Sequence, residues 1–190
     1  MSITSAKTGA TGISLALDNN FMEPIATTLI SSSGITTVSF LDIPQTYKHL
    51  HLRIFAKGAN TGNGVGTGSR MIFNNDSLAT NYWRHGINAY ASGISSNNAN
   101  DYDFWDIIGS STGLTSMFAI NIIDIPDYTN PNKNKVTRNL VGEDTNGNGS
   151  RLGPAAGIWN NTQPITSITL ISMGGNLVNG SRFSLYGIKG

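Results

Sequence analysis

Residues 167–190 read SITLISMGGNLVNGSRFSLYGIKG and carry the clearest β signal in the chain. Apolar and polar residues alternate at 168–171 and again at 183–188, and the segment between these runs is rich in Gly and Asn. This pattern predicts two β-strands, either as a hairpin or as a packed pair. We expect their apolar positions to close the core of a sandwich: Ile168, Leu170, Phe183 and Leu185.

Alternating runs recur through the rest of the chain. The strongest covers 47–57, where Leu50, Leu52 and Ile54 share one face and His49 and His51 lie on the other. The runs at 25–30 and 35–41 flank a Ser/Gly segment and predict a hairpin, whereas 58–69 and 93–101 predict polar loops. The sequence thus predicts nine or ten strands without helices. The expected fold is all-β, a jelly-roll-like antiparallel β-sandwich with an extended N-terminal arm.

The first 22 residues differ from the remainder and predict an N-terminal arm, with the β-sandwich domain spanning 23–190. Only Ile13, Leu15 and Leu17 alternate in this small, hydroxyl-rich segment, and Phe21 follows them. Two interpretations remain open: a loose terminus with one edge strand, or an arm that adds a strand to a neighbouring subunit. On the second interpretation, these four apolar residues are the candidate partner-binding positions.

Composition excludes several classes of function. The 190 residues carry a net charge of +1, and only 12% are charged. Basic residues are spread thinly, which predicts no nucleic-acid partner. No apolar run approaches the ~20 residues that span a bilayer, which predicts no membrane partner. Cysteine is absent, so disulfides and thiolate sites are excluded. The N-terminus lacks a signal-peptide pattern, which favours assembly in a cytoplasm.

Candidate chemical sites are few. His49 and His51 lie two apart on one strand face, and His85 is a conceivable third metal ligand, but Arg53 in the same row would repel a cation. Residues 144–149 imitate the first half of a calcium loop, but Ala155 stands where the bidentate Glu is required. The motif G-x-S-x-G is absent. We therefore predict no catalytic residue, no metal, no cofactor and no enzymatic activity.

Most large aromatic residues of the middle segment are expected in the core. Trp83 and Trp105 are the candidates for exposure, where they would stack on sugar rings or fill a subunit interface.

Several segments together resemble a known family. They are EPIATT (23–28), VSFLDIPQTYKHLHLRI (38–54), MIFNND (71–76) with the nearby NYWRHGI, IIDIPDYTNPNKNK (122–135), and GIWNNTQPITSITLISMGGN with GSRFSLYGIKG near the end. The combination resembles small all-β virion proteins of tailed bacteriophages, which are common in cyanophages and marine phages. The resemblance covers most of 23–190 and leaves the arm outside.

This resemblance implies a jelly-roll-like virion component. The expectation is a non-enzymatic capsid decoration or cement protein, a homotrimer on the capsid surface that bridges subunits of the major capsid protein and is assembled in the host cytoplasm. The alternative is a domain of a tail fibre or another host-facing appendage that binds a receptor glycan. A carbohydrate-active enzyme on a jelly roll is a third alternative, disfavoured because few acidic residues fall in strand centres.

Overall fold

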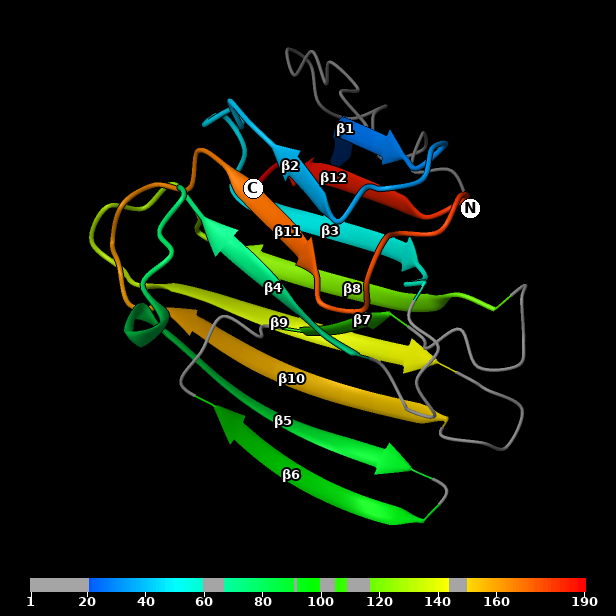
Figure 1. The fold of residues 1–190 in the computed structure, drawn as a ribbon. Helices are drawn as coiled ribbons and strands as arrows, with labels where there is room; N and C mark the ends of the chain where they lie inside the picture. Colours follow the sequence, from blue (N-terminus) through cyan, green and yellow to red (C-terminus); the bar gives the residue numbers. More distant parts are fainter. Residues whose placement is uncertain (1–20, 60–66, 91, 100–104, 109–116, 144–149) are drawn as a thin grey trace, which may run out of the picture.

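The computed structural model describes residues 21–59, 67–90, 92–99, 105–108, 117–143 and 150–190. Within these residues the chain forms twelve strands and one short 3-10 helix, arranged as two antiparallel sheets (Figure 1). The elements are β1 (Met22–Leu29), β2 (Thr37–Phe40), β3 (His49–Ala56), β4 (Thr67–Phe73), η2 (Ala79–Asn81), β5 (Tyr82–Tyr90), β6 (Gly93–Ala99), β7 (Trp105–Ile108), β8 (Ala119–Pro126), β9 (Lys135–Glu143), β10 (Arg151–Trp159), β11 (Ile168–Ser172) and β12 (Arg182–Ile188).

The order of pairing identifies the topology. The large sheet has the order β1-β12-β3-β8-β9-β10-β5-β6, and the small sheet has the order β2-β11-β4-β7. The pairs are nested: β1 with β12, β2 with β11, β3 with β8 and β4 with β7. Such nesting arises when one long antiparallel ribbon is rolled into two sheets, which is a jelly roll. The predicted all-β, jelly-roll-like sandwich is confirmed. Of the predicted arm at residues 1–22, residues 1–20 lie outside the described residues, and Met22 already begins β1.

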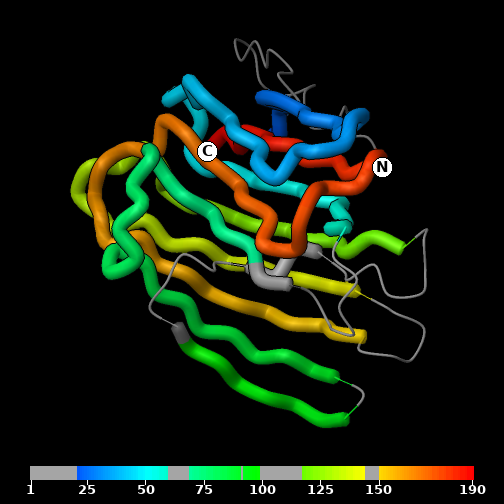
Figure 2. The backbone as a smooth tube through the Cα atoms, in the orientation of Figure 1, coloured from blue at the N-terminus to red at the C-terminus, as the bar shows by residue number. Residues whose placement is uncertain are grey.

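Two excursions from the ribbon enlarge one sheet. Strands β5 and β6 lie between β4 and β7 in the chain, and β9 and β10 lie between β8 and β11, yet all four join the large sheet. Figure 2 shows the small sheet in front of the half formed by β12, β3 and β8, while β10, β5 and β6 continue beyond it. The large sheet therefore has a jelly-roll half, formed by β1, β12, β3 and β8, and an extension, formed by β9, β10, β5 and β6.

The core lies between the small sheet and the jelly-roll half. Leu50, Leu52 and Ile54 of β3 are fully buried, as the alternation in 47–57 predicts. Burying one such side chain contributes about 1.5–3 kcal/mol. Facing side chains of both sheets complete one apolar cluster, among them Val38, Phe40, Met71, Phe73, Ile123, Ile125, Ile168, Leu170, Phe183 and Leu185.

The C-terminal stretch forms a packed pair of strands and not a hairpin. Strand β11 belongs to the small sheet and β12 to the large one, so the two face each other across the core. The four positions predicted to close the sandwich are all buried there. The Gly- and Asn-rich segment between them, 173–181, carries the chain from one sheet to the other, with positive φ at Gly175 and Gly180.

Two local predictions are wrong, and a third is wrong at its end, because the loop predicted at 58–69 gives way to strand β4 at Thr67. The runs at 25–30 and 35–41 do not pair as a hairpin, because β1 pairs with β12 and β2 pairs with β11 in different sheets. The segment 93–101 is not a loop throughout, because Gly93–Ala99 forms β6 and pairs with β5 from Tyr90↔Gly93 to Arg84↔Ala99. In both cases partner choice by the backbone overrides the local pattern.

An aromatic cluster joins the two sheets at one end of the core. The Trp159 ring stacks on Tyr82 with centroids 6.4 Å apart and lies 5.6 Å from the Phe73 ring. The Trp159 Nε1–H donates to Asp76 Oδ2 at 2.7 Å, and Asn81 Nδ2 donates to the same oxygen at 2.8 Å. Burial alone would raise the pKa of Asp76, but the hydrogen bonds from Trp159, Asn81 and Leu78 together hold that pKa below its ordinary value.

A buried lysine fixes the start of β9. The Lys135 side chain is almost fully buried, and its Nζ donates to the carbonyl oxygens of Asn130, Lys133 and Thr162 at 2.8, 2.8 and 2.7 Å. A buried ammonium is tolerated only when such acceptors replace its water. Lys135 therefore ties the turn that precedes β9 to the segment that follows β10.

Replacing Gly187 with alanine is expected to lower the free energy of unfolding by about 1–3 kcal/mol, because a Cβ at this position would overlap the Tyr47 ring. Tyr47 cannot shift freely, since its hydroxyl donates to Glu23 Oε2 at 2.9 Å. Urea denaturation measures the loss. The double variant Gly187→Ala/Tyr47→Ala should lose less than the sum of the single losses, and strict additivity would contradict the proposed overlap.

Candidate functional site

The outer face of the large sheet, which points away from the small sheet, is unusually apolar. Ten of the fourteen large hydrophobic side chains exposed in the described residues lie on this outer face, as the strand register places them. Exposed large apolar side chains that gather on one face mark an interaction site more often than plain solvent surface. The ten are Met22, Leu29, Phe55, Trp83, Ile87, Ile94, Ile120, Val136, Leu140 and Leu152.

The strand register arranges the outer face in cross-strand rows. One row, apolar except for Arg182, crosses all eight strands and, at about 4.8 Å per strand, is roughly 34 Å long. A second row, beginning at Pro24 and Tyr186, is polar in its middle. The apolar row runs Leu29, Arg182, Phe55, Ile120, Gly142, Leu152, Ala89 and Ile94. The polar row continues through His51, Asp124, Arg138, Ala156, His85 and Asn98.

Strand β9 inverts the usual pattern of a sandwich strand. Its exposed positions include Val136 and Leu140, whereas its buried positions include Lys135, Thr137 and Asn139. Charged side chains are also buried where the end of β9 pairs with β10. The side chains of Arg151 and Glu143 are buried there, with their Nε and Oε1 atoms 3.7 Å apart. Exposing aliphatic groups while burying polar ones is costly in an isolated chain. The inversion makes the outer face a candidate interaction surface.

A charged network occupies the middle of the polar row. Asp124 Oδ1 lies 2.7 Å from His51 Nδ1, and Asp124 Oδ2 accepts from Arg138 Nη2 at 2.7 Å and from Arg138 Nε at 3.2 Å. Arg53 Nε–H donates to His51 Nε2 at 3.3 Å. Because Nε2 accepts, the neutral His51 carries its proton on Nδ1 and donates it to Asp124. The network crosses β3, β8 and β9 and holds their register.

The structure does not bring the three histidines together as a metal site. His51 uses both ring nitrogens in the network, and His49 Nδ1 accepts from the Asp127 N–H at 3.0 Å. His85 is four strands from His51, roughly 19 Å at 4.8 Å per strand. Within the described ranges, no cluster of three His, Cys, Asp or Glu side chains could hold a metal ion. The calcium-like segment 144–149 falls outside those ranges.

Protonating Asp124 should destabilise the fold in acid. Burial alone would raise the pKa of Asp124, but Arg138 and His51 together lower that pKa below its ordinary value of 3.8. The stabilisation is therefore complete above about pH 4 and is lost as the pH falls through the lower pKa of the folded state. Urea denaturation from pH 5 to pH 2 should show a shallower loss for Asp124→Asn than for the unmodified chain. The exposed-carboxyl control Asp42→Asn should follow the unmodified chain, and identical slopes for all three proteins would refute the role of Asp124.

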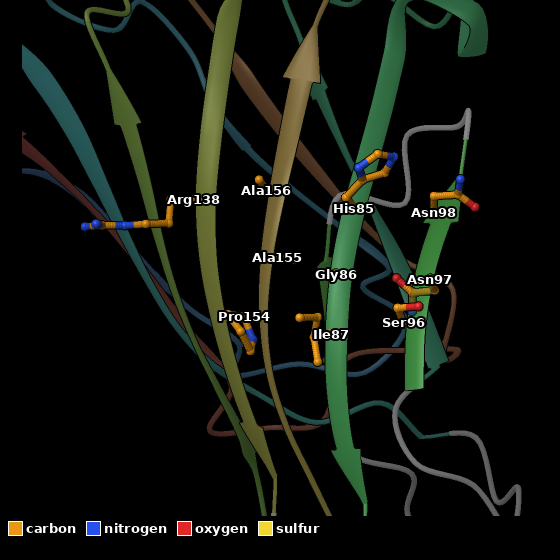
Figure 3. A pocket seen from close by; sticks show the side chains of 10 residues that line it. All are labelled: His85, Gly86, Ile87, Ser96, Asn97, Asn98, Arg138, Pro154, Ala155 and Ala156. Carbon is orange, nitrogen blue, oxygen red and sulfur yellow. The ribbon is translucent and has the colours of Figure 1, made fainter. Parts of the chain in front are cut away.

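Three hollows indent the outer face. The largest, about 660 Å³, has a floor of small residues from β10 and β5 (Figure 3). Arg138 of β9 stands on one side of it and His85, Ser96 and Asn98 of β5 and β6 on the other. A second hollow of about 560 Å³ spans β1, β12, β3 and β8, and includes Arg53 and Arg182. A third of about 400 Å³ lies beside Phe21 and Ile188.

The structure separates the residues proposed from the sequence. Trp83 lies on the outer face and is 47% exposed, next to His85 in the same strand. Trp105 begins β7 in the small sheet, so it is not brought together with Trp83, and its side chain lies outside the described part of the chain. Phe21 is 68% exposed and borders the third hollow. Ile13, Leu15 and Leu17 lie outside the described residues.

Sequence reasoning missed most of the outer face. The sequence does not predict that Ile94, Leu140 and Leu152 are exposed on one face, because alternation alone does not reveal which side of a strand faces the core. One signal was present: the run KVTRNLVGE at 135–143 alternates polar and aliphatic residues, and Lys135 occupies the same face as Thr137 and Asn139. Burial of that polar face could not be deduced without the position of β9 in the sheet.

Comparison with protein-family models, with curated proteins and with solved structures finds no match to the chain. In the described residues, no helix has the length and apolar character needed to cross a bilayer.

Proposed function

We propose that this chain is a non-enzymatic structural protein of a bacteriophage virion, in the simplest case a capsid decoration or cement protein. The chain associates with itself, as a homotrimer, and bridges neighbouring subunits of the major capsid protein on the capsid surface. The observation that carries the proposal is the inverted polarity of β9 within an apolar outer face. Such a face fits a structural protein whose exposed apolar surface is buried against neighbouring subunits.

The size of the outer face fits a stable protein contact. Its ten large hydrophobic side chains are between 37% and 78% exposed, which amounts to an apolar area on the order of 1,000 Å². A standard interface uses about 800 Å² from each partner. Covering that area in an assembly of many copies stabilises a shell, because each modest contact is repeated.

Electron microscopy of labelled particles tests the proposal. An antibody against the purified full-length chain should label the capsid surface of virus particles from a culture that carries the natural gene. Labelling at regular capsid positions is the expected result. Absence of the chain from purified particles would overturn the virion assignment, and labelling confined to the tail tip would replace the cement function with the appendage function.

A receptor-binding appendage is the second candidate, and one observation favours it. Trp83 is exposed in the same strand as His85, which lines the largest hollow with Ser96, Asn97 and Asn98. Trp83 does not line this hollow itself, but an exposed indole two residues from a hollow with hydroxyl and amide groups suits a sugar ring. A glycan array distinguishes the two functions: an appendage should bind a defined glycan and lose it in Trp83→Ala, whereas a cement protein should bind none.

A further inference from the structure

The second hollow on the outer face contains two arginines from neighbouring strands. Arg53 of β3 pairs across the strands with Ser184 of β12, and Arg182 pairs with Phe55, so the arginines are diagonal neighbours. Diagonal partners on antiparallel strands are about 7–8 Å apart at the backbone, within reach of long side chains. Both line the same hollow of about 560 Å³, here called the arginine cleft.

The arginine cleft has positive charge that no described carboxylate neutralises. Both arginines are exposed, and no described Asp or Glu forms an ion pair with either of them. Arg138 on the same outer face differs, because Asp124 accepts two hydrogen bonds from its guanidinium. The charge of Arg138 is thus balanced by Asp124, whereas no carboxylate in the described part of the chain balances Arg53 or Arg182.

The remaining groups of the arginine cleft are hydroxyls and apolar walls. Thr27 Oγ1 donates to Ser184 Oγ at 3.0 Å, which leaves the Ser184 hydroxyl hydrogen available to an acceptor. Tyr186 also lines the cleft. Phe55 and Ile120 form its apolar side and belong to the long apolar row. The cleft therefore offers several hydrogen-bond donors next to hydrophobic surface.

From this arrangement we infer that the arginine cleft binds a carboxylate, namely an Asp or Glu side chain flanked by apolar residues on a partner protein. Arginine pairs bidentately with carboxylates, and such charge-assisted bonds are among the strongest in proteins. The apolar surroundings favour a protein segment over a sugar acid, whose hydroxyls would need polar partners on the walls formed by Phe55 and Ile120. The inference rests on the proposed assembly function and specifies the chemistry of one contact.

Peptide titration tests the arginine cleft directly. A capped leucine–glutamate–leucine tripeptide is titrated into the ¹⁵N-labelled full chain, with the leucine–glutamine–leucine tripeptide as the neutral control. The titration is repeated on Leu152→Lys, whose substitution lies two strands away from the cleft and weakens self-association. We expect saturable shifts of cleft resonances with the glutamate peptide only. Affinity should fall at least tenfold in Arg53→Gln and in Arg182→Gln, and should be retained in Lys133→Gln, a control at an exposed basic residue outside the cleft.

The outcomes separate the inference from the proposed function. Equal shifts with both tripeptides, or no shift in either protein, would overturn the carboxylate site while leaving virion labelling intact. Glucuronate binding tenfold tighter than the glutamate peptide would overturn the choice of a protein partner. Specific glutamate binding by a chain that is absent from virus particles would keep the site and remove the proposed function.

Discussion

Trp159→Ala should lower the free energy of unfolding by about 3–5 kcal/mol, a large part of the stability of a single domain. The substitution removes a fully buried indole and opens a cavity beside Tyr82 and Phe73. It also removes one of the hydrogen bonds that Asp76 accepts. Urea denaturation followed by far-ultraviolet circular dichroism measures the effect without relying on tryptophan fluorescence.

Trp83 provides the matched control, because its strand β5 pairs with β10 and its side chain points to the outer face. Trp83→Ala should cost less than about 1 kcal/mol in the isolated chain, since the indole is already 47% exposed. The free energy lost by Trp159→Phe should lie between the losses of the two alanine variants. We expect about 1–3 kcal/mol, mainly because Asp76 loses one hydrogen-bond donor. Equal losses for the two alanine variants would contradict the assignment of inner and outer faces.

Leu152→Lys is expected to weaken self-association about 100-fold, which corresponds to roughly 3 kcal/mol. Leu152 is 57% exposed in the middle of the apolar row, between Gly142 and Ala89. A lysine there must either lose its water in the interface or keep the two surfaces apart. Sedimentation equilibrium of the full-length chain measures the change, and circular dichroism verifies that the fold is retained.

Leu41→Lys is the control for this experiment. Leu41 is 64% exposed, follows β2 of the small sheet and does not belong to the outer face. Its substitution should leave the association constant within about twofold. If Leu41→Lys disrupts the oligomer while Leu152→Lys does not, the interface lies on the opposite side of the molecule.

The sequence predicts individual strands better than their partners. The two faces of β3 were readable because four successive inward positions are apolar. Strand β6 was not readable, because Ser95, Ser96 and Asn97 resemble a loop and gain their strand conformation from backbone pairing with β5. The Ser/Gly segment at 31–34 looks like a hairpin turn, yet it connects two sheets. Long-range pairing of this kind leaves no trace in a local window.

The outer face was less predictable than the core for a related reason. In β8 both faces carry isoleucine, with Ile123 buried and Ile120 exposed. The sequence pattern therefore does not show which face of this strand points to the core. The His51–Asp124–Arg138 network requires three strands in a fixed register, which depends on pairings between residues 73 and 14 positions apart. Trp83 could be proposed from its residue type alone, but its neighbours in space could not.

The nested pairing of the strands also determines when the molecule can fold. Thr27 of β1 and Ser184 of β12 are 157 residues apart, so β1 has no partner until almost all of the described chain has been made. At roughly 5–20 residues per second, this delay is about 8–30 s on the ribosome. The first strand must remain unpaired for that time, and later closure through non-local contacts is slow, on the order of milliseconds to seconds. The low charge of the chain makes this waiting period the stage most exposed to aggregation.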